Sequence, residues 1–121
     1  MTTEKMEHFK EDEFKCKCGK CDGGKMSEEL LFKLQIARKE CGFPFKITSA
    51  FRCRPHNIAV KGSPNSQHLR GNAVDVYCTD SRKRYALVQA LMACGFRGIG
   101  VAKTFIHGDV RQGEARIWFY Q

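Results

Sequence analysis

The most constraining feature of this sequence is an aspartate, Asp75, inside the apolar run of residues 73–78 (Ala-Val-Asp-Val-Tyr-Cys). The surrounding Val and Ala residues predict a β-strand, yet aspartate is disfavoured in strands and costly to bury without a partner. A cation or a strong set of hydrogen-bond donors must therefore compensate the carboxylate. His68 precedes it in the chain, and Gly71 between them allows a turn that brings the imidazole beside the start of the strand.

A third polar residue of interest lies on a later strand pattern, residues 104–110. Side chains alternate between the two faces of a strand, so His107 and Asp109 share one face, opposite two residues that suit a core, Ile106 and Val110. His68, Asp75 and His107 therefore predict two imidazoles and one carboxylate around an open position, the pattern of a catalytic zinc site. A lone histidine on a strand is more often a hydrogen-bonded structural residue, so the prediction depends on the whole set.

Two segments have the apolar periodicity of amphipathic helices. Residues 27–41 repeat apolar side chains at steps of three and four residues, with Ser27 as the predicted N-cap. Residues 81–94 follow a similar pattern after a capping residue at Asp80 or Ser81. On this second helix, the side chains expected to face the core are Tyr85, Val88, Leu91 and Met92.

Short alternating runs predict strands at residues 45–49, 73–78, 98–101, 104–110 and 115–120. A polar stretch with two prolines predicts a long loop from Arg52 to Gln67. We therefore expect one α+β domain over residues 1–121, with a small, mainly antiparallel sheet and two or three helices packed on one side.

Charge and hydropathy limit the partners of the chain. Its net charge of +8 favours anionic partners such as nucleic acid, lipid headgroups or bacterial cell wall. The aromatic and basic patterns of common nucleic-acid modules are missing, so we expect no nucleic-acid binding.

Met1 to Glu13 has no apolar signal-peptide region, and no apolar run approaches the roughly 20 residues that span a bilayer. We expect a monomer made in the cytoplasm, without membrane insertion.

The seven cysteines fall into two groups. An odd number of cysteines in a chain with no recognisable signal peptide argues against a disulfide framework. Three cysteines in apolar patterns are expected to be buried small hydrophobes: Cys41, Cys78 and Cys94. In the cysteine-rich segment 1–25, the thiols of Cys16, Cys18 and Cys21 form a compact cluster. They are interpreted as a structural zinc site with Cys53 as fourth ligand, or alternatively as reduced thiols or a disulfide formed after release from the cell.

Three ordered motifs give the sequence a resemblance to a known family. Residues 66–75 (SQHLRGNAVD) are similar to the metal signature of the zinc D-Ala-D-Ala carboxypeptidase and L-alanyl-D-glutamate endopeptidase family. Residues 47–57 (ITSAFRCRPHN) resemble its Thr-Ser-Gly-Tyr-Arg segment with a following His-Asn. Residues 98–111 (GIGVAKTFIHGDVR) resemble the segment that carries its last histidine ligand. The resemblance is strongest to the short phage and prophage branch and covers roughly residues 8–120.

This resemblance implies a hedgehog/DD-peptidase-like fold and a zinc metallopeptidase that hydrolyses a peptidoglycan stem-peptide bond involving a D-amino acid. It implies one catalytic zinc ion held by His68, Asp75 and His107, and Arg52 as the arginine that polarises the substrate. The partner would be bacterial peptidoglycan, reached after release from the cell, as by a phage endolysin, or within a virion. The residues expected to contact substrate nearby are Ser66, Gln67 and His56.

One position departs from the family pattern. Many members have a glutamate or aspartate three residues before the last histidine ligand, and this chain has Thr104 there. Threonine cannot act as a general base near neutral pH. Asp109 is the best local candidate for the base, and its alternative role is to orient a ligand or Arg111. The departure leaves a second function open, a non-catalytic zinc-bound module that docks to cell wall or to a virion structure.

Overall fold

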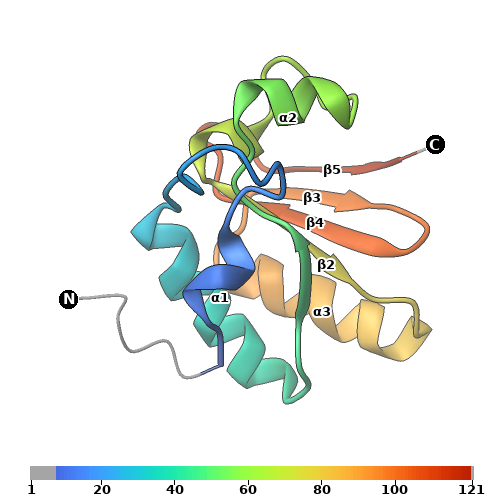
Figure 1. Ribbon diagram of the computed structural model, residues 1–121. Helices are drawn as coiled ribbons and strands as arrows, with labels where there is room; N and C mark the ends of the chain where they lie inside the picture. The colour runs from blue at the N-terminus through green and yellow to red at the C-terminus, as the bar shows by residue number, and fades with distance from the viewer. Residues whose placement is uncertain (1–7, 121) are drawn as a thin grey trace.

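The computed structural model describes residues 8–120. The first seven residues, where we predict no signal peptide, and Gln121 lie outside the described part of the chain. The elements in order are the 3-10 helix η1 (Glu11–Phe14), α1 (Glu28–Cys41), β1 (Lys46–Ser49), α2 (Arg54–Ala59), the 3-10 helix η2 (Gln67–Arg70), β2 (Ala73–Tyr77), α3 (Ser81–Ala93), β3 (Gly98–Val101), β4 (Phe105–Asp109) and β5 (Arg116–Phe119) (Figure 1). That one domain spans residues 1–121 stays a prediction.

Within the described residues, five strands form one sheet in the order β1-β2-β4-β3-β5. Every neighbouring pair is antiparallel except β3 and β5, which run parallel. This arrangement confirms the predicted α+β class with a mainly antiparallel sheet. In the β2–β4 pair, Asp75 lies opposite His107 and Ala73 lies opposite Asp109. The register therefore gathers the polar side chains of these two strands on one face of the sheet.

The hydrophobic core lies between the other face of the sheet and helices α1 and α3, which pack side by side (Figure 1). The strands contribute Val74, Val76 and Ile106, and α1 contributes Leu30 and Leu34, all buried. Helix α1 begins after the predicted N-cap residue, whose hydroxyl accepts a hydrogen bond from the backbone of the first turn. Of the three cysteines expected in the core, Cys78 is buried, whereas Cys41 and Cys94 are only half-buried at the α1–α3 side.

Helix α3 turns to the core a side that agrees only in part with its predicted face: Leu91 and, in part, Val88 lie there as predicted, whereas Tyr85 and Met92 do not. Leu87 and Leu91 are fully buried, but Tyr85 is 74% exposed and Met92 is 58% exposed. Val88 packs partly against the core. Apolar side chains extend around more than one face of this helix, so periodicity alone left its rotation ambiguous. Packing against β4 and α1 selects the face that carries the two leucines.

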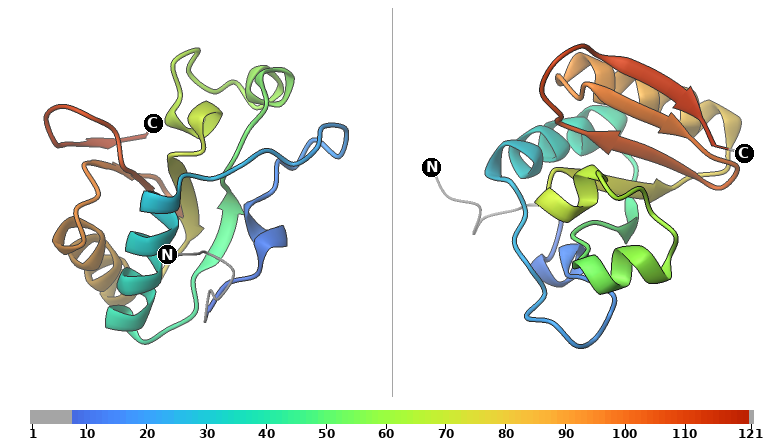
Figure 2. Two further views of the ribbon diagram at one scale, coloured as in Figure 1. Left: turned by 90° about the vertical axis from the view of Figure 1, so that its left-hand side faces the viewer. Right: turned by 90° about the horizontal axis from the view of Figure 1, so that it is seen from above.

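The predicted loop from Arg52 to Gln67 contains a short helix, α2, so that prediction was wrong in its details. Pro55 stands in the first turn of α2, where a backbone N–H has no helical partner to lose. Helix α2 and the segment after it lie over the face of the sheet opposite α1 and α3 (Figure 2). Of the three α-helices within residues 8–120, two therefore cover the core and the third borders the polar face. Among residues 8–120, no helix has the length and apolar character to cross a membrane.

Candidate active site

A cleft of about 580 Å³ opens on the polar face of the sheet. Asp75 and His107 form its floor, and the segments after α2 and at η2 form one wall. Basic side chains border it at three points, Arg52, Lys61 and Arg111, whereas Asp75 is the only carboxylate among the residues that line it. The cleft is therefore suited to a substrate that carries negative charge.

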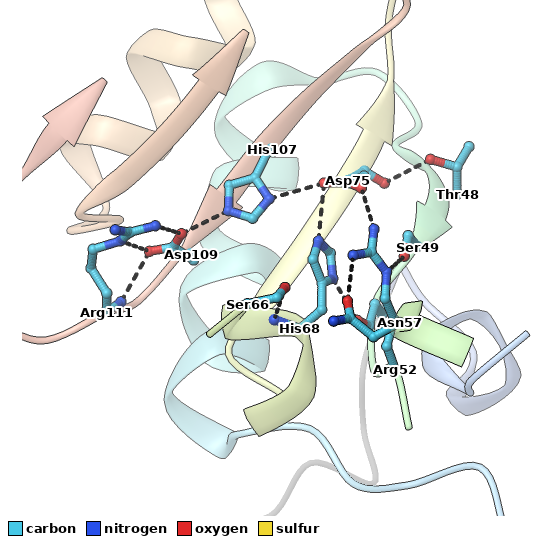
Figure 3. A network of polar contacts seen from close by, with 11 residues as sticks. Thr48, Ser49, Arg52, Asn57, Ser66, His68, Asp75, His107, Asp109 and Arg111 are labelled. Carbon is cyan, nitrogen blue, oxygen red and sulfur yellow. Dashed lines mark hydrogen bonds and ion pairs between the residues drawn. The ribbon is translucent and has the colours of Figure 1, made fainter. Parts of the chain in front are cut away.

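Three predicted ligands from separate elements converge on the floor of this cleft (Figure 3). His68 comes from η2, Asp75 from β2 and His107 from β4. One oxygen of Asp75 lies 3.3 Å from Nε2 of His68 and 3.0 Å from Nδ1 of His107. One potential ligand atom from each residue lies within 4.8 Å of the others, and all three residues are buried. The structure brings the predicted set together, and metal binding by it remains a prediction.

Each imidazole forms a hydrogen bond through the nitrogen that faces away from Asp75, and this bond determines which ring nitrogen keeps its lone pair available. Nδ1 of His68 lies 2.6 Å from the carbonyl oxygen of Ala50, to which it can only donate. Nε2 of His107 lies 2.7 Å from Oδ2 of Asp109, a charged acceptor. In the neutral rings these bonds leave lone pairs on Nε2 of His68 and Nδ1 of His107, both directed at the Asp75 carboxylate. Two lone pairs facing a carboxylate repel one another unless protons or a cation lie between them. This donor set therefore fits a divalent metal ion.

The pKa values of the site residues reflect this crowding of charge. Burial alone would raise the pKa of Asp75, but hydrogen bonds with His107 and His68 outweigh it and hold that pKa well below its ordinary value. Burial alone would lower the pKa of His107, but hydrogen bonds with Asp109 and Asp75 outweigh it and raise that pKa. The hydrogen bonds of the site thus favour the charged forms of Asp75 and His107, and a metal ion that bound Nδ1 of His107 would have to displace the proton there.

Arg52 is held at the edge of the cleft by three partners. Its Nε donates to Ser49 Oγ at 3.1 Å, and its Nη1 donates to Asn57 Oδ1 at 3.2 Å. Its Nη2 lies 3.5 Å from Oδ2 of Asp75. Asn57, on α2, is buried and in turn donates to the carbonyl of Ser63 at 2.9 Å. The missed helix α2 thus supplies the residue that orients the guanidinium.

Asp109 lies behind His107, away from the cleft. It is fully buried, and its Oδ2 also accepts from Nη2 of Arg111 at 2.8 Å, while Oδ1 accepts from Nε of Arg111 at 2.8 Å. Burial would raise the pKa of Asp109, but the bonds from Arg111 and His107 outweigh it and keep that pKa low. Gly98 on β3 lies beside it, and a Cβ atom there would overlap the carboxylate. The absence of a side chain at Gly98 leaves the space that the Asp109 carboxylate occupies.

The remaining predicted site residues are placed as follows. Ser66 and Gln67 line the cleft, and the Ser66 hydroxyl also caps η2 by accepting from the backbone N–H of His68 at 3.1 Å. His56 is half-buried on α2 and is not among the residues that line the cleft. Thr104 is exposed before β4, and its carbonyl accepts from the backbone N–H of Cys78 at 2.9 Å.

Sequence reasoning missed an aromatic wall on β5 and the residue after it. The ring centroids of Trp118 and Tyr120 lie 5.4 Å and 6.5 Å from that of His107. The Arg111 guanidinium lies 4.9 Å above the Trp118 ring. Alternation along residues 117–120 could have placed both aromatics on one face, but only the pairing of Gly100 with Trp118 directs that face to the site. A side chain at Gly100 would press into both rings.

Comparison with known proteins decides the family. The sequence model described as Peptidase M15 matches residues 7–109. This chain belongs to the peptidase M15 family. The match confirms the family resemblance seen in the motifs, whereas membership of a phage branch stays a prediction.

Two further comparisons add to this. A search of curated proteins finds no match. Among solved structures, the crystal structure of the L-Ala D-Glu endopeptidase ChiX of Serratia marcescens superposes with a TM-score of 0.51 at 19% sequence identity, over 71% of this chain and 80% of that one. At this identity the likeness concerns the fold alone, and it confirms the α+β architecture of this M15 chain.

Proposed function

We propose that this M15 chain is a zinc-dependent peptidase that hydrolyses a peptidoglycan stem-peptide bond involving a D-amino acid, after release from the cell in which it is made. The observation that carries the proposal is the pair of imidazoles whose free nitrogens both face Asp75. His68, Asp75 and His107 would bind one zinc ion and leave its remaining position open to the cleft.

Other residues of the chain would have separate roles in the proposed hydrolysis. A zinc ion at this site would polarise the scissile carbonyl and acidify the attacking water. Arg52, already aligned by Ser49 and Asn57, is placed to donate hydrogen bonds to negative charge that develops on the substrate, or to a substrate carboxylate. The aromatic side chains of Trp118 and Tyr120 line the cleft on the β5 side and place apolar surface beside His107.

We assign Asp109 a positioning role and not that of the general base. Both of its oxygens are occupied by His107 and Arg111, and the side chain has no exposed surface. A base must reach the proton that it accepts, at hydrogen-bond distance or through one water molecule. Asp109 instead holds His107 in the tautomer that presents Nδ1 to the metal.

The charge of the cleft supports the proposed substrate class. Peptidoglycan stem peptides carry free carboxylates, and Arg52, Lys61 and Arg111 border the cleft with positive charge. Ser66 and Gln67 add neutral hydrogen-bonding groups on the wall formed by η2. We therefore propose that these five residues contact the stem peptide, and we leave His56 out of that set.

The test uses purified peptidoglycan, on which new amine and carboxyl ends are measured together with zinc content. The wild-type chain should bind zinc in the site and release peptide fragments, and His68→Ala should abolish both. His56→Ala is the matched control, because it removes an imidazole outside the cleft and should leave both unchanged. Undiminished hydrolysis by His68→Ala would contradict the proposal.

A second function is favoured by one observation, the lack of any carboxylate other than Asp75 among the residues that line the cleft. The chain would then be a zinc-bound module that docks to cell wall or to a virion structure without hydrolysis. A zinc-loaded chain that binds purified wall and releases no new ends would support this function over the first.

A further inference from the structure

We propose that Cys16, Cys18, Cys21 and Cys53 bind a single zinc ion that ties the N-terminal segment to the start of α2. One sulfur from each residue lies within 4.8 Å of the others. This cluster is separate from the residues that line the active-site cleft, so it is independent of the proposed catalytic zinc ion.

The spacing of the sulfur atoms fits a tetrahedral ion and not a disulfide. Zinc binds thiolates at about 2.3 Å, which places the corners of a regular tetrahedron about 3.8 Å apart. The sulfurs of Cys16 and Cys53 are 3.7 Å apart. A disulfide bond would require about 2.05 Å, and all four cysteines are free. The sulfurs of Cys16 and Cys53 therefore already have the separation of two zinc ligands.

The backbone around the cluster is arranged to stabilise negative sulfur. Cys18 Sγ accepts from the backbone N–H groups of Lys20 and Cys21, each at 3.2 Å. Cys21 Sγ accepts from Gly23 at 3.3 Å, and Cys16 Sγ accepts from the N–H of Cys53 at 3.4 Å. Hydrogen bonds to a charged acceptor are stronger than those to a neutral one, so these contacts favour thiolates. Exposed lysines next to the cysteines in sequence offset the negative charge of a four-thiolate site: Lys15, Lys17 and Lys20.

The cluster joins a segment without regular structure to the start of α2. The segment from Lys15 to Gly23 has no regular element, and just before it the Phe14 carbonyl accepts a hydrogen bond from the Phe51 N–H at 3.3 Å. Cys53, the N-cap residue of α2, stands on the other side of the connection. Both views of Figure 2 show the N-terminal loop beside the start of α2. Four protein ligands leave no open position, which indicates a structural ion.

Metal content and stability of the full chain, purified under reducing conditions without chelator, test the site. Wild-type chain should hold about two zinc equivalents, and Cys18→Ser and His68→Ala should each lose one. Cys18→Ser should also lower the midpoint of thermal unfolding by about 10 °C or more, because the closed site is lost. The matched control is Cys94→Ser, which removes a half-buried thiol outside the cluster and should keep both ions.

These outcomes separate the two metal sites. If the catalytic proposal fails, wild-type chain should still hold one zinc ion that only the cysteine variants remove. If Cys18→Ser retains as much zinc as the wild-type chain, the thiol site is wrong.

A measurement on the wild-type chain avoids dependence on variants that fail to fold. Zinc should protect Cys18 and Cys21 from alkylation, and a chelator should raise their alkylation rate at least about tenfold, since a bound thiolate reacts poorly. Equal rates with and without chelator would overturn the proposal. Two other results would also overturn it. One is a mass lower by two hydrogens with Cys16 and Cys53 linked in a disulfide, and the other is an iron ion bound in place of zinc.

Discussion

At the residue scale, the proposed positioning role of the buried Asp109 carboxylate can be tested directly, because it bonds to both His107 and Arg111. Replacing it by asparagine keeps the shape but removes the charge that holds His107 and Arg111. We expect Asp109→Asn to lower zinc affinity and hydrolysis by about 10- to 100-fold, as is typical of groups that orient a metal ligand. Chelator competition measures the zinc affinity, and release of new amine ends from peptidoglycan measures the hydrolysis.

The control for this variant is Asp80→Asn. It makes the same chemical change at the exposed N-cap of α3, where asparagine caps a helix as well as aspartate does. Zinc affinity and hydrolysis should remain at the wild-type level. An Asp109→Asn chain that binds zinc normally but hydrolyses nothing would identify Asp109 as the general base after all.

The raised pKa of His107 predicts a specific pH dependence for the stability of the protein without bound metal. Burial lowers its pKa, but hydrogen bonds with Asp109 and Asp75 outweigh burial, so its folded pKa lies above the unfolded value of about 6.5. The protonated ring therefore contributes stability that is fully present below about pH 6.5 and is lost as the pH rises through the folded pKa. We expect the urea midpoint of chelated protein to decrease as the pH rises above about 6.5.

Zinc-loaded protein should lack this loss, because the metal requires the unprotonated nitrogen and binds more tightly as the pH rises. Urea unfolding with and without chelator at each pH measures the difference. A chelated protein whose midpoint rises over the same range would show that His107 is not stabilised in its protonated form.

At the scale of elements, the rotation of α3 makes a testable difference between neighbouring residues. Leu91 is fully buried against the sheet, whereas Met92 is 58% exposed. Leu91→Ala should lower the free energy of unfolding by about 2–5 kcal/mol, because it loses apolar burial and leaves a cavity. Met92→Ala should change that free energy by less than about 0.5 kcal/mol. Urea unfolding of both variants tests which face of α3 is buried. Similar decreases in the free energy of unfolding of the two variants would contradict the burial of Leu91 and the exposure of Met92.

Helix α2 illustrates why the sequence underestimated one element. Two prolines and two asparagines in the Arg52–Gln67 stretch indicate a loop, because each disfavours a helix interior. Pro55, however, stands in the first turn, and Asn57 is buried with its side chain bonded to Arg52 and to the Ser63 carbonyl. Only six residues are helical, too few for apolar periodicity to appear. Tertiary hydrogen bonds, and not propensity, hold this helix.

At the scale of the whole molecule, the net charge of +8 and the basic border of the cleft should make wall binding depend on salt. We expect binding of chelated protein to purified peptidoglycan to weaken as sodium chloride rises from about 0.05 to 0.5 M. Lys61→Gln should weaken binding further at low salt, because it removes charge at the cleft. A pelleting assay with labelled protein measures both.

The matched control is Lys39→Gln, which makes the same change in net charge at an exposed position on α1, on the far side of the sheet. It should bind the wall nearly as well as wild-type protein. Equal weakening by the two variants would mean that overall charge, and not the cleft, governs binding.

The sequence by itself determined the elements with clear periodicity, most of their boundaries, and the set of three polar residues in the cleft. Those features depend on neighbours in the chain: alternation on β4, the turn at Gly71, and an aspartate that an apolar strand cannot bury alone. Only the tertiary structure decided the face of α3, the aromatic wall on β5 and the orientation of Asp75. Each depends on contacts between distant segments, as in the packing of α3 against α1 and β4 and the pairing of Gly100 with Trp118. Local sequence limits which side chains can share a face, but the packing of separate elements decides which of them meet.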